Sequence, residues 1–374
     1  MALKTSTASK NHVFFKRAQL GPKENEEGVI TKGDKTRQNF ADENDNHVET
    51  LASSEVENHV ESEEEEVPYR VEIAWRSTII LSVIHFMGIW GLINLLVGKI
   101  YLKSFAIQWV IGQMGALGTT GGAHRYWAHR SYRATRPLQI FLAFCQTISV
   151  QNSIYEWVRD HRVHHKFTET NADPHNAKRG FFFAHMGWLM VRKHPDVIRK
   201  GATVDMSDLE NDPVVSFQRR HYLPLITIIA FILPTVIVAW SGETWLNSWL
   251  LTMFRYILAL HLTWLVNSAA HLYGMRPYDK GISPRECWYV SMFALGEANL
   301  MMLIILITPK HNYHHVYPQD YRTSEFGIYH TNLTALFIDM CAYFGWVYGR
   351  KTVPKRIVEA RVLRTGDGSE YRHH

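Results

Sequence analysis

Trp157-Val-Arg-Asp-His-Arg-Val-His-His-Lys-Phe167 carries three histidines and lies between two strongly apolar regions of the chain. We predict that this stretch is a helix. On a helix, His161 shares a face with His164 and His165, three and four residues later, while the adjacent pair diverges by about 100°. Imidazoles arranged in this way can serve two metal ions at once.

Two further histidine groups lie elsewhere in the chain. His311-Asn-Tyr-His-His315 repeats the H-x-x-H-H spacing, whereas His124-Arg-Tyr-Trp-Ala-His129 has a spacing of five. On a regular helix that spacing separates the two rings by about 140°. Either one of this pair therefore lies beyond a helix end, or the two serve different ions. His271 is a further ligand candidate because of its spacing from Asn267.

Composition limits the possible classes of protein. The chain has 374 residues and a formal net charge of only +5, which gives no strong support for a nucleic-acid partner. Its three cysteines are widely separated and form no C-x-x-C motif. This usage indicates a reducing compartment and argues against a disulfide framework or a thiolate zinc site.

The two ends of the chain differ from its middle. Residues 1–67 are polar, rich in Asn and Glu and without periodicity, so we expect a disordered acidic tail. Neither a secretory signal nor a transit peptide is evident in them. Residues 351–374 form a basic C-terminal tail, and residues 68–350 between the tails form the predicted membrane domain.

The apolar segments predict an all-α integral membrane protein with four transmembrane helices in two hairpins and a cytosolic, histidine-rich helical cap. Each segment is close to the length that crosses about 30 Å of hydrocarbon. Buried helices of a soluble protein are the alternative, above all for the second segment, which contains Gln108 and Gln113. Because Arg and Lys crowd the stretches outside the hairpins, both termini and all histidine groups are expected in the cytosol. The four predicted spans are residues 77–97, 105–123, 223–240 and 245–267.

The residue types of the three groups restrict the metal chemistry. No Glu-x-x-His motif of the carboxylate di-iron bundles accompanies the histidines. Imidazole suits iron, copper and zinc alike, but structural zinc needs only four ligands. Nine histidines therefore predict two ions with open coordination positions. Isolated histidines are instead expected to be satisfied core residues; these are His85, His175, His185, His194, His221, His261 and His330.

At these residues the sequence resembles the membrane fatty-acid desaturases with histidine boxes, specifically the acyl-CoA Δ9 group of animals and fungi, over about residues 68–350. The most specific stretches are Gly121-Gly-Ala-His-Arg-Tyr-Trp-Ala-His-Arg-Ser-Tyr132, Glu156-Trp-Val-Arg-Asp-His-Arg-Val-His-His-Lys-Phe167, Asp173-Pro-His-Asn176, Arg179-Gly-Phe-Phe-Phe-Ala-His185, Val191-Arg-Lys-His-Pro195 and Asn267-Ser-Ala-Ala-His-Leu-Tyr-Gly274.

The resemblance implies an oxidoreductase of the endoplasmic reticulum membrane with a non-haem site of two iron ions (Fe²⁺). Asn267 would hold a water on one iron, and Asn152 and Trp157 would line the bend of a kinked acyl tunnel. The nine iron ligands would be His124, His129, His161, His164, His165, His271, His311, His314 and His315. The coenzyme A head group would lie near Arg159, Asp160, Arg192 and Lys193, although these charges would also suit a solvated face near anionic lipid.

The resemblance also implies the co-substrates. An unactivated methylene cannot lose hydrogen to ordinary acid–base groups, so a metal and O2 must supply the oxidising power. The two electrons would come from cytochrome b5 and its reductase, with Lys178 and Arg179 as candidate docking residues. Long-chain acyl-CoA would be the substrate and membrane lipid the surroundings. Because all methylenes are chemically alike, a tunnel of fixed depth must select the carbon.

Two small residues are expected to set the depth of the tunnel. Ala116 and Gly112 precede His124 by eight and twelve residues, or roughly 12 and 18 Å along a helix. By the resemblance they close the tunnel, and a glycine there predicts tolerance of chains at least as long as stearoyl. The alternative is that Gly112 and Gly115 merely let helices approach closely.

One segment departs from the family pattern. Residues 298–310 stand between Gly296-Glu297 and His311, where the family has only two residues. A helical insertion would shift the third histidine box by roughly 16 Å and destroy the site. The insertion could instead loop out, with Pro309 ending it, or reflect a mis-predicted exon boundary.

Three other functions remain open at this point. A catalytically inactive, desaturase-like lipid-binding protein is an alternative because of the insertion. A related di-iron hydroxylase would share the histidine boxes. A histidine-rich membrane zinc protein is disfavoured, because the boxes lie outside the predicted spans.

Overall fold

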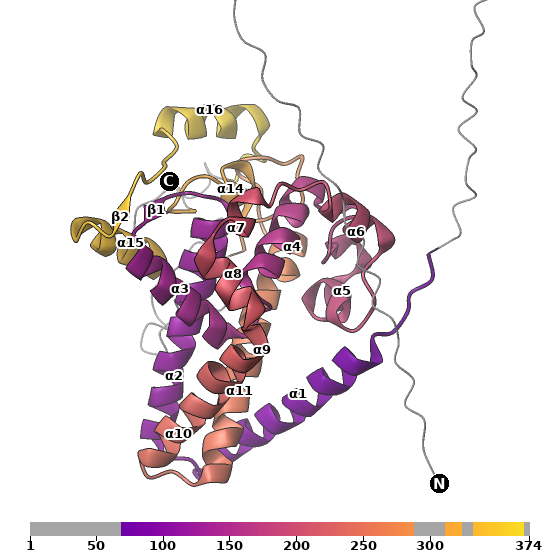
Figure 1. Cartoon of the computed structure of the whole chain (residues 1–374). Coiled ribbons are helices and arrows are strands. Elements are labelled where there is room, and N and C mark those ends of the chain that lie inside the picture. The colour runs from indigo at the N-terminus through magenta and orange to yellow at the C-terminus, as the bar shows by residue number, and fades with distance from the viewer. Residues whose placement is uncertain (1–68, 288–310, 324–331, 370–374) are drawn as a thin grey trace, which may run out of the picture. The chain divides into compact units, whose positions relative to one another are not determined.

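The computed structural model describes residues 69–287, 311–323 and 332–369, which are mainly helical (Figure 1). The acidic tail at residues 1–67, the insertion at residues 298–310 and His330 lie outside the described residues. The described chain falls into a group of long apolar helices and a cap of short helices that carries the histidines.

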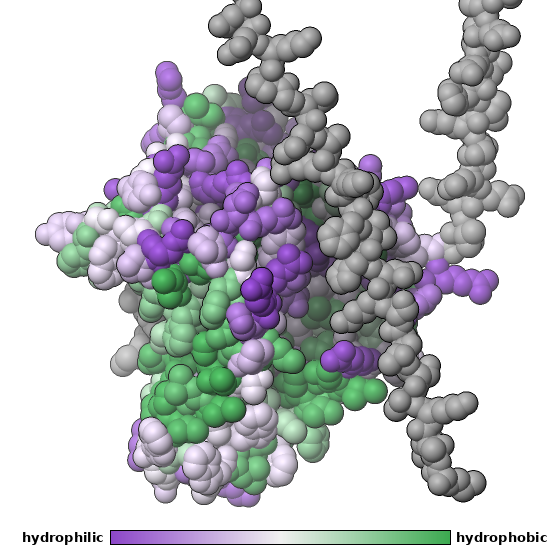
Figure 2. Space-filling view, viewed as in Figure 1, coloured by the Kyte–Doolittle hydropathy of each residue, from purple (hydrophilic) through white to green (hydrophobic). Residues whose placement is uncertain are grey.

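Three helices of the described residues are long and apolar enough to cross a membrane, which confirms three of the four predicted spans. They are α1 (Trp75–Leu96), the continuous helix Tyr222–Trp240, and α11 (Trp245–Asn267) running on into α12 (Ala269–Leu272). The helix Tyr222–Trp240 comprises α9 (Tyr222–Leu225), the π-helix η4 (Ile226–Ile232) and α10 (Leu233–Trp240). Figure 2 shows apolar side chains gathered over this end of the structure and hydrophilic ones over the cap.

The fourth predicted span, residues 105–123, is not confirmed by length. Its α-helix, α2 (Leu102–Leu117), has only 16 residues. It continues without a break into a π-helix, η1 (Gly118–Ala128), which carries His124 and is largely buried in the cap. The apolar stretch is therefore followed at once by the first histidine pair, His124 and His129.

The long helices approach one another closely at glycines. A Cβ atom at Gly91 of α1 would lie 2.4 Å from the carbonyl oxygen of Leu250 in α11. A Cβ atom at Gly118 would lie 2.0 Å from the backbone nitrogen of Gln146. Gln146 belongs to α3 (Arg136–Ser149), a short apolar helix that packs against α2 and η1.

The predicted helix through residues 157–167 is confirmed as α4 (Ile154–Phe167). It begins at Ser153, whose hydroxyl accepts a hydrogen bond from the backbone N–H of Glu156. Such a cap satisfies one of the amides that a helix start leaves without a partner. The apolar face of α4 packs through Val158 into the core that it shares with α3 and η1.

Short elements complete the described cap. After α4 come η2 (Ala177–Arg179), α5 (Phe181–His185), η3 (Gly187–Leu189), α6 (Pro195–Gly201), α7 (Ser207–Glu210) and α8 (Pro213–Arg220). Near the C-terminus come α14 (His311–Val316), α15 (Leu333–Tyr343) and α16 (Lys355–Thr365). The strands β1 (Arg133–Ala134) and β2 (Val347–Tyr348) pair antiparallel, with Arg133 opposite Tyr348.

Candidate metal centre

The fold brings all nine predicted histidine ligands into two adjacent groups. Within each group the ring nitrogens lie within 4.8 Å of one another, which is the spacing of ligands around one ion. The first group comprises His124, His129, His161, His165 and His314. The second group comprises His164, His271, His311 and His315.

The helix α4 divides its histidines between the two groups, as its spacing predicts. His161 and His165, four residues apart, belong to the first group, and His164 belongs to the second. The helix α14 makes the same division, with His314 in the first group and His311 and His315 in the second. The third histidine box therefore reaches the other two, and the shift considered for a helical insertion does not occur.

The π-helix explains the spacing of five. In a π-helix the backbone N–H of one residue bonds the carbonyl five residues earlier, so positions i and i+5 lie one turn apart. Here the N–H of His129, just beyond the end of η1, donates to the carbonyl of His124 at 3.1 Å. Both rings join the first group. The expected position of His129 beyond a helix end is confirmed, and the placement of both rings in one group favours it over separate ions for the two histidines.

The histidine side chains point their Nε2 atoms at one another. The distance between Nε2 atoms is 2.9 Å for His124 and His314, and 2.8 Å for His129 and His161. In the second group, the Nε2 atoms of His271 and His311 are 2.9 Å apart. A neutral imidazole has only one N–H, so such a cluster cannot hydrogen-bond every ring nitrogen within itself. The Nε2 atom of His315 is buried without a partner.

Burial keeps these imidazoles neutral. Burial, with a smaller contribution from the Arg162 guanidinium, lowers the pKa of His129 to about 3. Burial first, and then neighbouring histidines, also lower the pKa values of His161, His165 and His314 well below the ordinary value. Neutral imidazole is the form that binds a metal ion. Convergent Nε2 atoms, a buried ring nitrogen without a partner and lowered pKa values all fit two bound ions.

Two carboxylates form hydrogen bonds with histidines of the second group. The Nδ1 atom of His164 lies 2.9 Å from Oδ1 of Asp173, and the Nδ1 atom of His271 lies 3.0 Å from Oε1 of Glu169. Each carboxylate is fixed in turn, because the N–H of Glu169 donates to Asp173 and the hydroxyl of Ser283 donates to Glu169. These bonds place the Nδ1 protons and leave both Nε2 atoms free to bind an ion.

The two groups therefore differ in charge. Within the described residues, no carboxylate bonds a ring nitrogen of the first group, whereas two of the four second-group histidines have one. Although burial alone would raise the pKa of the Asp173 carboxyl, His164 and His175 hold it well below its ordinary value. Neither Asp173 nor Glu169 was predicted from the sequence as a partner of the histidines. Nothing in the spacing of Asp173-Pro-His assigns it a bond to His164.

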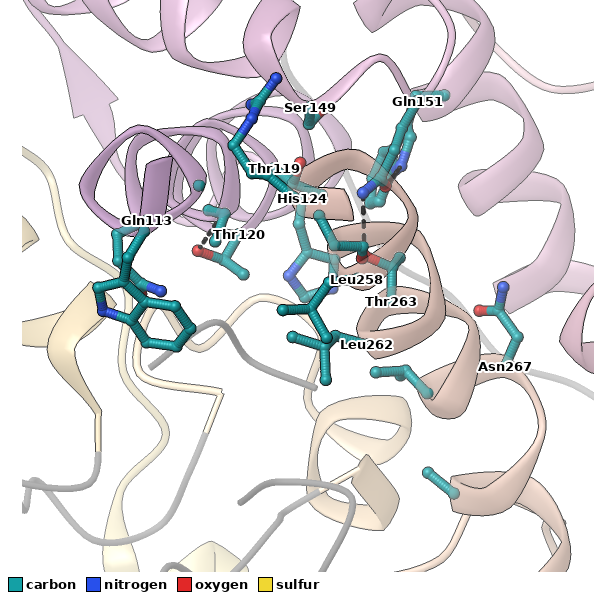
Figure 3. Close-up of a pocket in the computed structure, with 18 of the residues that line it drawn as sticks. Gln113, Thr119, Thr120, His124, Ser149, Gln151, Leu258, Leu262, Thr263 and Asn267 are labelled. Carbon is teal, nitrogen blue, oxygen red and sulfur yellow. Dashed lines mark hydrogen bonds between the residues drawn. The ribbon is translucent and has the colours of Figure 1, made fainter. Parts of the chain in front are cut away.

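A single cavity runs from the histidine groups into the apolar helices (Figure 3). Helices α2 and α11 supply most of its walls, and both predicted depth-setting residues, Gly112 and Ala116, line it. At the other end of the cavity lie Asn267, the predicted water-holding residue, and several histidines. The histidines that line the cavity are His124, His161, His164, His311 and His314.

The predicted bend is lined by Trp157 but not by Asn152. Its neighbour Gln151 occupies the wall instead, where its Nε2 atom donates to the hydroxyl of Thr263 at 2.9 Å (Figure 3). The indole N–H of Trp157 reaches the Oε1 atom of Gln151 at 3.3 Å. Asn152 has a left-handed φ of 67°, and its carbonyl accepts from Gln146. Because of this turn, Gln151 lines the cavity where Asn152 was predicted to do so, which the sequence did not reveal.

Of the four residues predicted to hold the coenzyme A head group, the three cations are exposed or partly exposed on the cap, whereas Asp160 is buried. Asp160 forms ion pairs with both Arg159 and Lys193, which brings three of the four together. The fourth, Arg192, has 73% of its side chain exposed and pairs with Glu72. Partly exposed cations of this kind can bind phosphate groups.

Most isolated histidines are hydrogen-bonded, as expected, but His221 is exposed and so does not belong to the core. His85, His261 and His185 form a chain, with ring nitrogens 3.1 Å and 2.9 Å apart. The chain ends at the Leu81 carbonyl and the Ser268 hydroxyl. His175 differs in that its Nδ1 atom has no hydrogen-bond partner. This atom lies 3.4 Å from Oδ1 of Asp173, the carboxylate that bonds His164 of the second group.

Fold and site together describe a chain with membrane-capable helices and two histidine groups that could hold metal ions beside a cavity between the apolar helices. The sequence matches the family described as "Fatty acid desaturase" over residues 101–351. An acyl-CoA Delta-9 desaturase of Acheta domesticus is 50% identical over 315 residues, 83% of this chain and 84% of the relative. An acyl-CoA Delta12-desaturase of the same species is 50% identical over 307 residues, 81% of this chain and 82% of the relative.

A vertebrate relative gives the same result. The stearoyl-CoA desaturase of Homo sapiens is 50% identical over 303 residues, 80% of this chain and of the relative. The chain belongs to the fatty acid desaturase family.

Proposed function

We propose that the protein is an acyl-CoA desaturase that inserts a cis double bond, at Δ9, into a saturated long-chain fatty acyl-CoA. It would consume O2 and two electrons from cytochrome b5. The observation that carries the proposal is the single cavity that joins the two histidine groups to an apolar tunnel between α2 and α11. Relatives named as acyl-CoA desaturases support the substrate class.

The two ions are proposed to be iron, held by the nine histidines, with Asn267 orienting a water beside one of them. Iron supplies the redox chemistry with O2 that breaks unactivated C–H bonds. The protein supplies neutral imidazoles, excludes water by burial and fixes the second group through Glu169 and Asp173. Iron fits better than structural zinc, because zinc usually takes four ligands with some thiolate.

The chain's own residues would position the acyl group. Arg159 and Lys193 would hold the coenzyme A phosphates at the cap surface, together with Arg192. The ring of Trp157 stacks on His161, with centroids 4.9 Å apart. A chain that bends past Trp157 therefore passes directly beside the first histidine group. Because the methylenes do not differ chemically, the depth of the tunnel beyond this bend determines which carbon lies there.

The position of the double bond is a separate part of the proposal. Sequence identity does not decide it, because relatives named Delta-9 and Delta12 desaturases are both 50% identical to this chain. Gly112 and Ala116 line the cavity, which supports a long methyl-terminal segment beyond the double bond and therefore agrees with a bond at Δ9. The products must therefore be mapped chemically.

We place the enzyme in the endoplasmic reticulum membrane, with both termini cytosolic and α2 as the fourth span. The continuous helix from α2 into η1 supports this arrangement, because it carries His124 out of the apolar region into the cap. The cap then presents the site to cytosolic cytochrome b5. All three histidine boxes contribute to the two histidine groups, which supports an active enzyme rather than an inactive lipid-binding protein.

Expression in desaturase-deficient yeast tests the proposal. The fatty acids of cells that express the chain would be compared with those of cells that express His161→Ala. New monounsaturated acids only with the unmodified chain are expected, and their cleavage products give the bond position. A hydroxylated product would instead identify a hydroxylase, and no product from a well-expressed protein would refute the enzyme.

A second form of the protein tests the insertion. Residues 298–310 are replaced by Gly-Phe, the length expected for the family. We expect both forms to make the product, since the third histidine box already lies with the other two. Product from the shortened form alone would show that the insertion blocks activity.

A further inference from the structure

The cavity contains polar atoms without partners far from the histidines. Gln108 is 1% exposed, and its Oε1 atom has no hydrogen-bond partner. Arg255 is 7% exposed, and its Nε atom likewise has none. Both residues line the cavity. A buried polar atom without a partner is costly, so a native site of this kind calls for an explanation.

The remaining atoms of Gln108 are fixed. Its Nε2 atom donates to the hydroxyl of Thr252 at 2.6 Å. That hydroxyl donates in turn to the carbonyl of Ser248 at 2.9 Å. Thr252 therefore holds the amide, and the acceptor oxygen of Gln108 remains for a further group.

Arg255 is fixed in a similar way. Its Nη2 atom donates to the carbonyl of Ala230, in the π-helix η4, at 2.7 Å. Its Nη1 atom lies 3.4 Å from the carbonyl of Ile148. In the described part of the chain, no carboxylate lies within ion-pair distance of this guanidinium. Its Nε–H is therefore a donor without a partner.

The two residues line the cavity within about one helical turn of each other, away from the histidine groups. On α11, Arg255 and Thr252 precede Thr263, which bonds Gln151, by eight and eleven residues, or about 12 and 16 Å along the axis. Gln108 on α2 bonds Thr252, and Gly112, one turn further along α2, faces Arg255 at 3.4 Å from its Cγ atom. The methyl-terminal part of a long acyl chain would reach this level.

Resting on the proposed function, we propose that this level is a binding subsite for a hydroxyl group near the methyl end of the acyl chain. A hydroxyl donates one hydrogen bond and accepts others, which matches the acceptor of Gln108 and the donor of Arg255. A carboxylate only accepts, so it would leave Gln108 without a partner. A methyl group would satisfy neither atom. The preferred substrates thus include ω-hydroxyacyl-CoAs, with an ordered water filling the subsite under shorter chains.

The test uses the purified full-length protein loaded with iron. Binding of ω-hydroxyacyl-CoAs and of plain acyl-CoAs of matched length is measured by competition against a labelled acyl-CoA, and turnover is measured separately. We expect the hydroxylated chain to bind at least as tightly as its plain counterpart at the length that reaches Gln108. An apolar pocket would reject the hydroxyl by about a hundredfold, and that result would overturn the subsite.

Two variants assign the effect to the subsite. Gln108→Leu should lower the ratio of hydroxylated to plain binding at least about tenfold. Gln113→Leu is the matched control, because Gln113 lines the same cavity on the same helix but is only partly buried, and its ratio should stay unchanged. An unchanged ratio in Gln108→Leu would refute the assignment. Failure to desaturate stearoyl-CoA would refute the proposed function, whereas the binding ratio would still decide the subsite.

Discussion

If the two histidine groups hold iron as proposed, removing the charge from Asp173 or Glu169 should release one of the two proposed irons before the other. Among the nine histidines of the two groups, these carboxylates bond only His164 and His271, both of the second group, at 2.9 and 3.0 Å. The side chain of Asp173 is fully buried and that of Glu169 is 8% exposed, so solvent screens neither charge effectively. Loss of such a partner typically lowers metal affinity 10- to 100-fold, or about 1.4–2.7 kcal/mol. We expect this loss from either Asp173→Asn or Glu169→Gln.

Anaerobic titration of the apoprotein with Fe²⁺ measures this effect independently of activity. The unmodified protein should take up two irons per chain, and each variant should retain the first tightly and bind the second weakly. Asp208→Asn is the control, because Asp208 bonds Arg130 and Arg162 rather than a histidine, and it should keep two irons. Equal weakening of both irons, or of neither, would refute the assignment of these carboxylates to one ion.

Three further predictions concern the tunnel, the packing and the response to acid. Gly112→Tyr should shift the products of stearoyl- and palmitoyl-fed cells toward shorter chains, because the new ring enters the cavity that Gly112 lines; an unchanged profile counts against this tunnel. Gly118→Ala should lower the free energy of unfolding by about 3 kcal/mol or more, because the new Cβ atom would lie 2.0 Å from the backbone nitrogen of Gln146. Gly201→Ala is the control and should keep the melting temperature, because the atom nearest to its Cβ would be 3.7 Å away. Equal melting temperatures for the two variants would contradict the packing. Burial alone would raise the pKa of Asp208, but hydrogen bonds from Arg162 and Arg130 lower it to about 2. The stabilisation that the charged Asp208 provides is therefore complete above its ordinary pKa of about 4 and is lost as the pH falls through about 2. Asp208→Asn should flatten the acid side of the curve of stability against pH, and an unaltered curve would contradict this account.

The ligand set could be predicted from the sequence because helix geometry places i, i+3 and i+4 on one side. In the structure the histidines of α4 do divide between two groups. Three of the four spans followed from length and apolarity alone. The fourth did not, because α2 becomes a π-helix at Gly118 and no simple periodicity marks that change.

The supporting residues could not be predicted, because they act through the backbone path of loops. Glu169 reaches His271 across a hundred residues of sequence, from a left-handed backbone with φ of 62°. Gln151 rather than Asn152 faces the tunnel because the chain turns at Asn152, also with positive φ. Neither turn contains the glycine that usually signals such a conformation.

The π-helix η1 gives the first histidine box an unusual form of fragility. Most substitutions along a helix leave the register of the remaining residues intact, but deletion of one residue from a π-helix favours the ordinary α-helix. Such a deletion between His124 and His129 would reduce their spacing to four, and an α-helix would still set both on one side. The ring positions relative to α4 and α14 would nevertheless rotate by about 100°. In this box, the number of residues therefore matters to the geometry as much as their identity does.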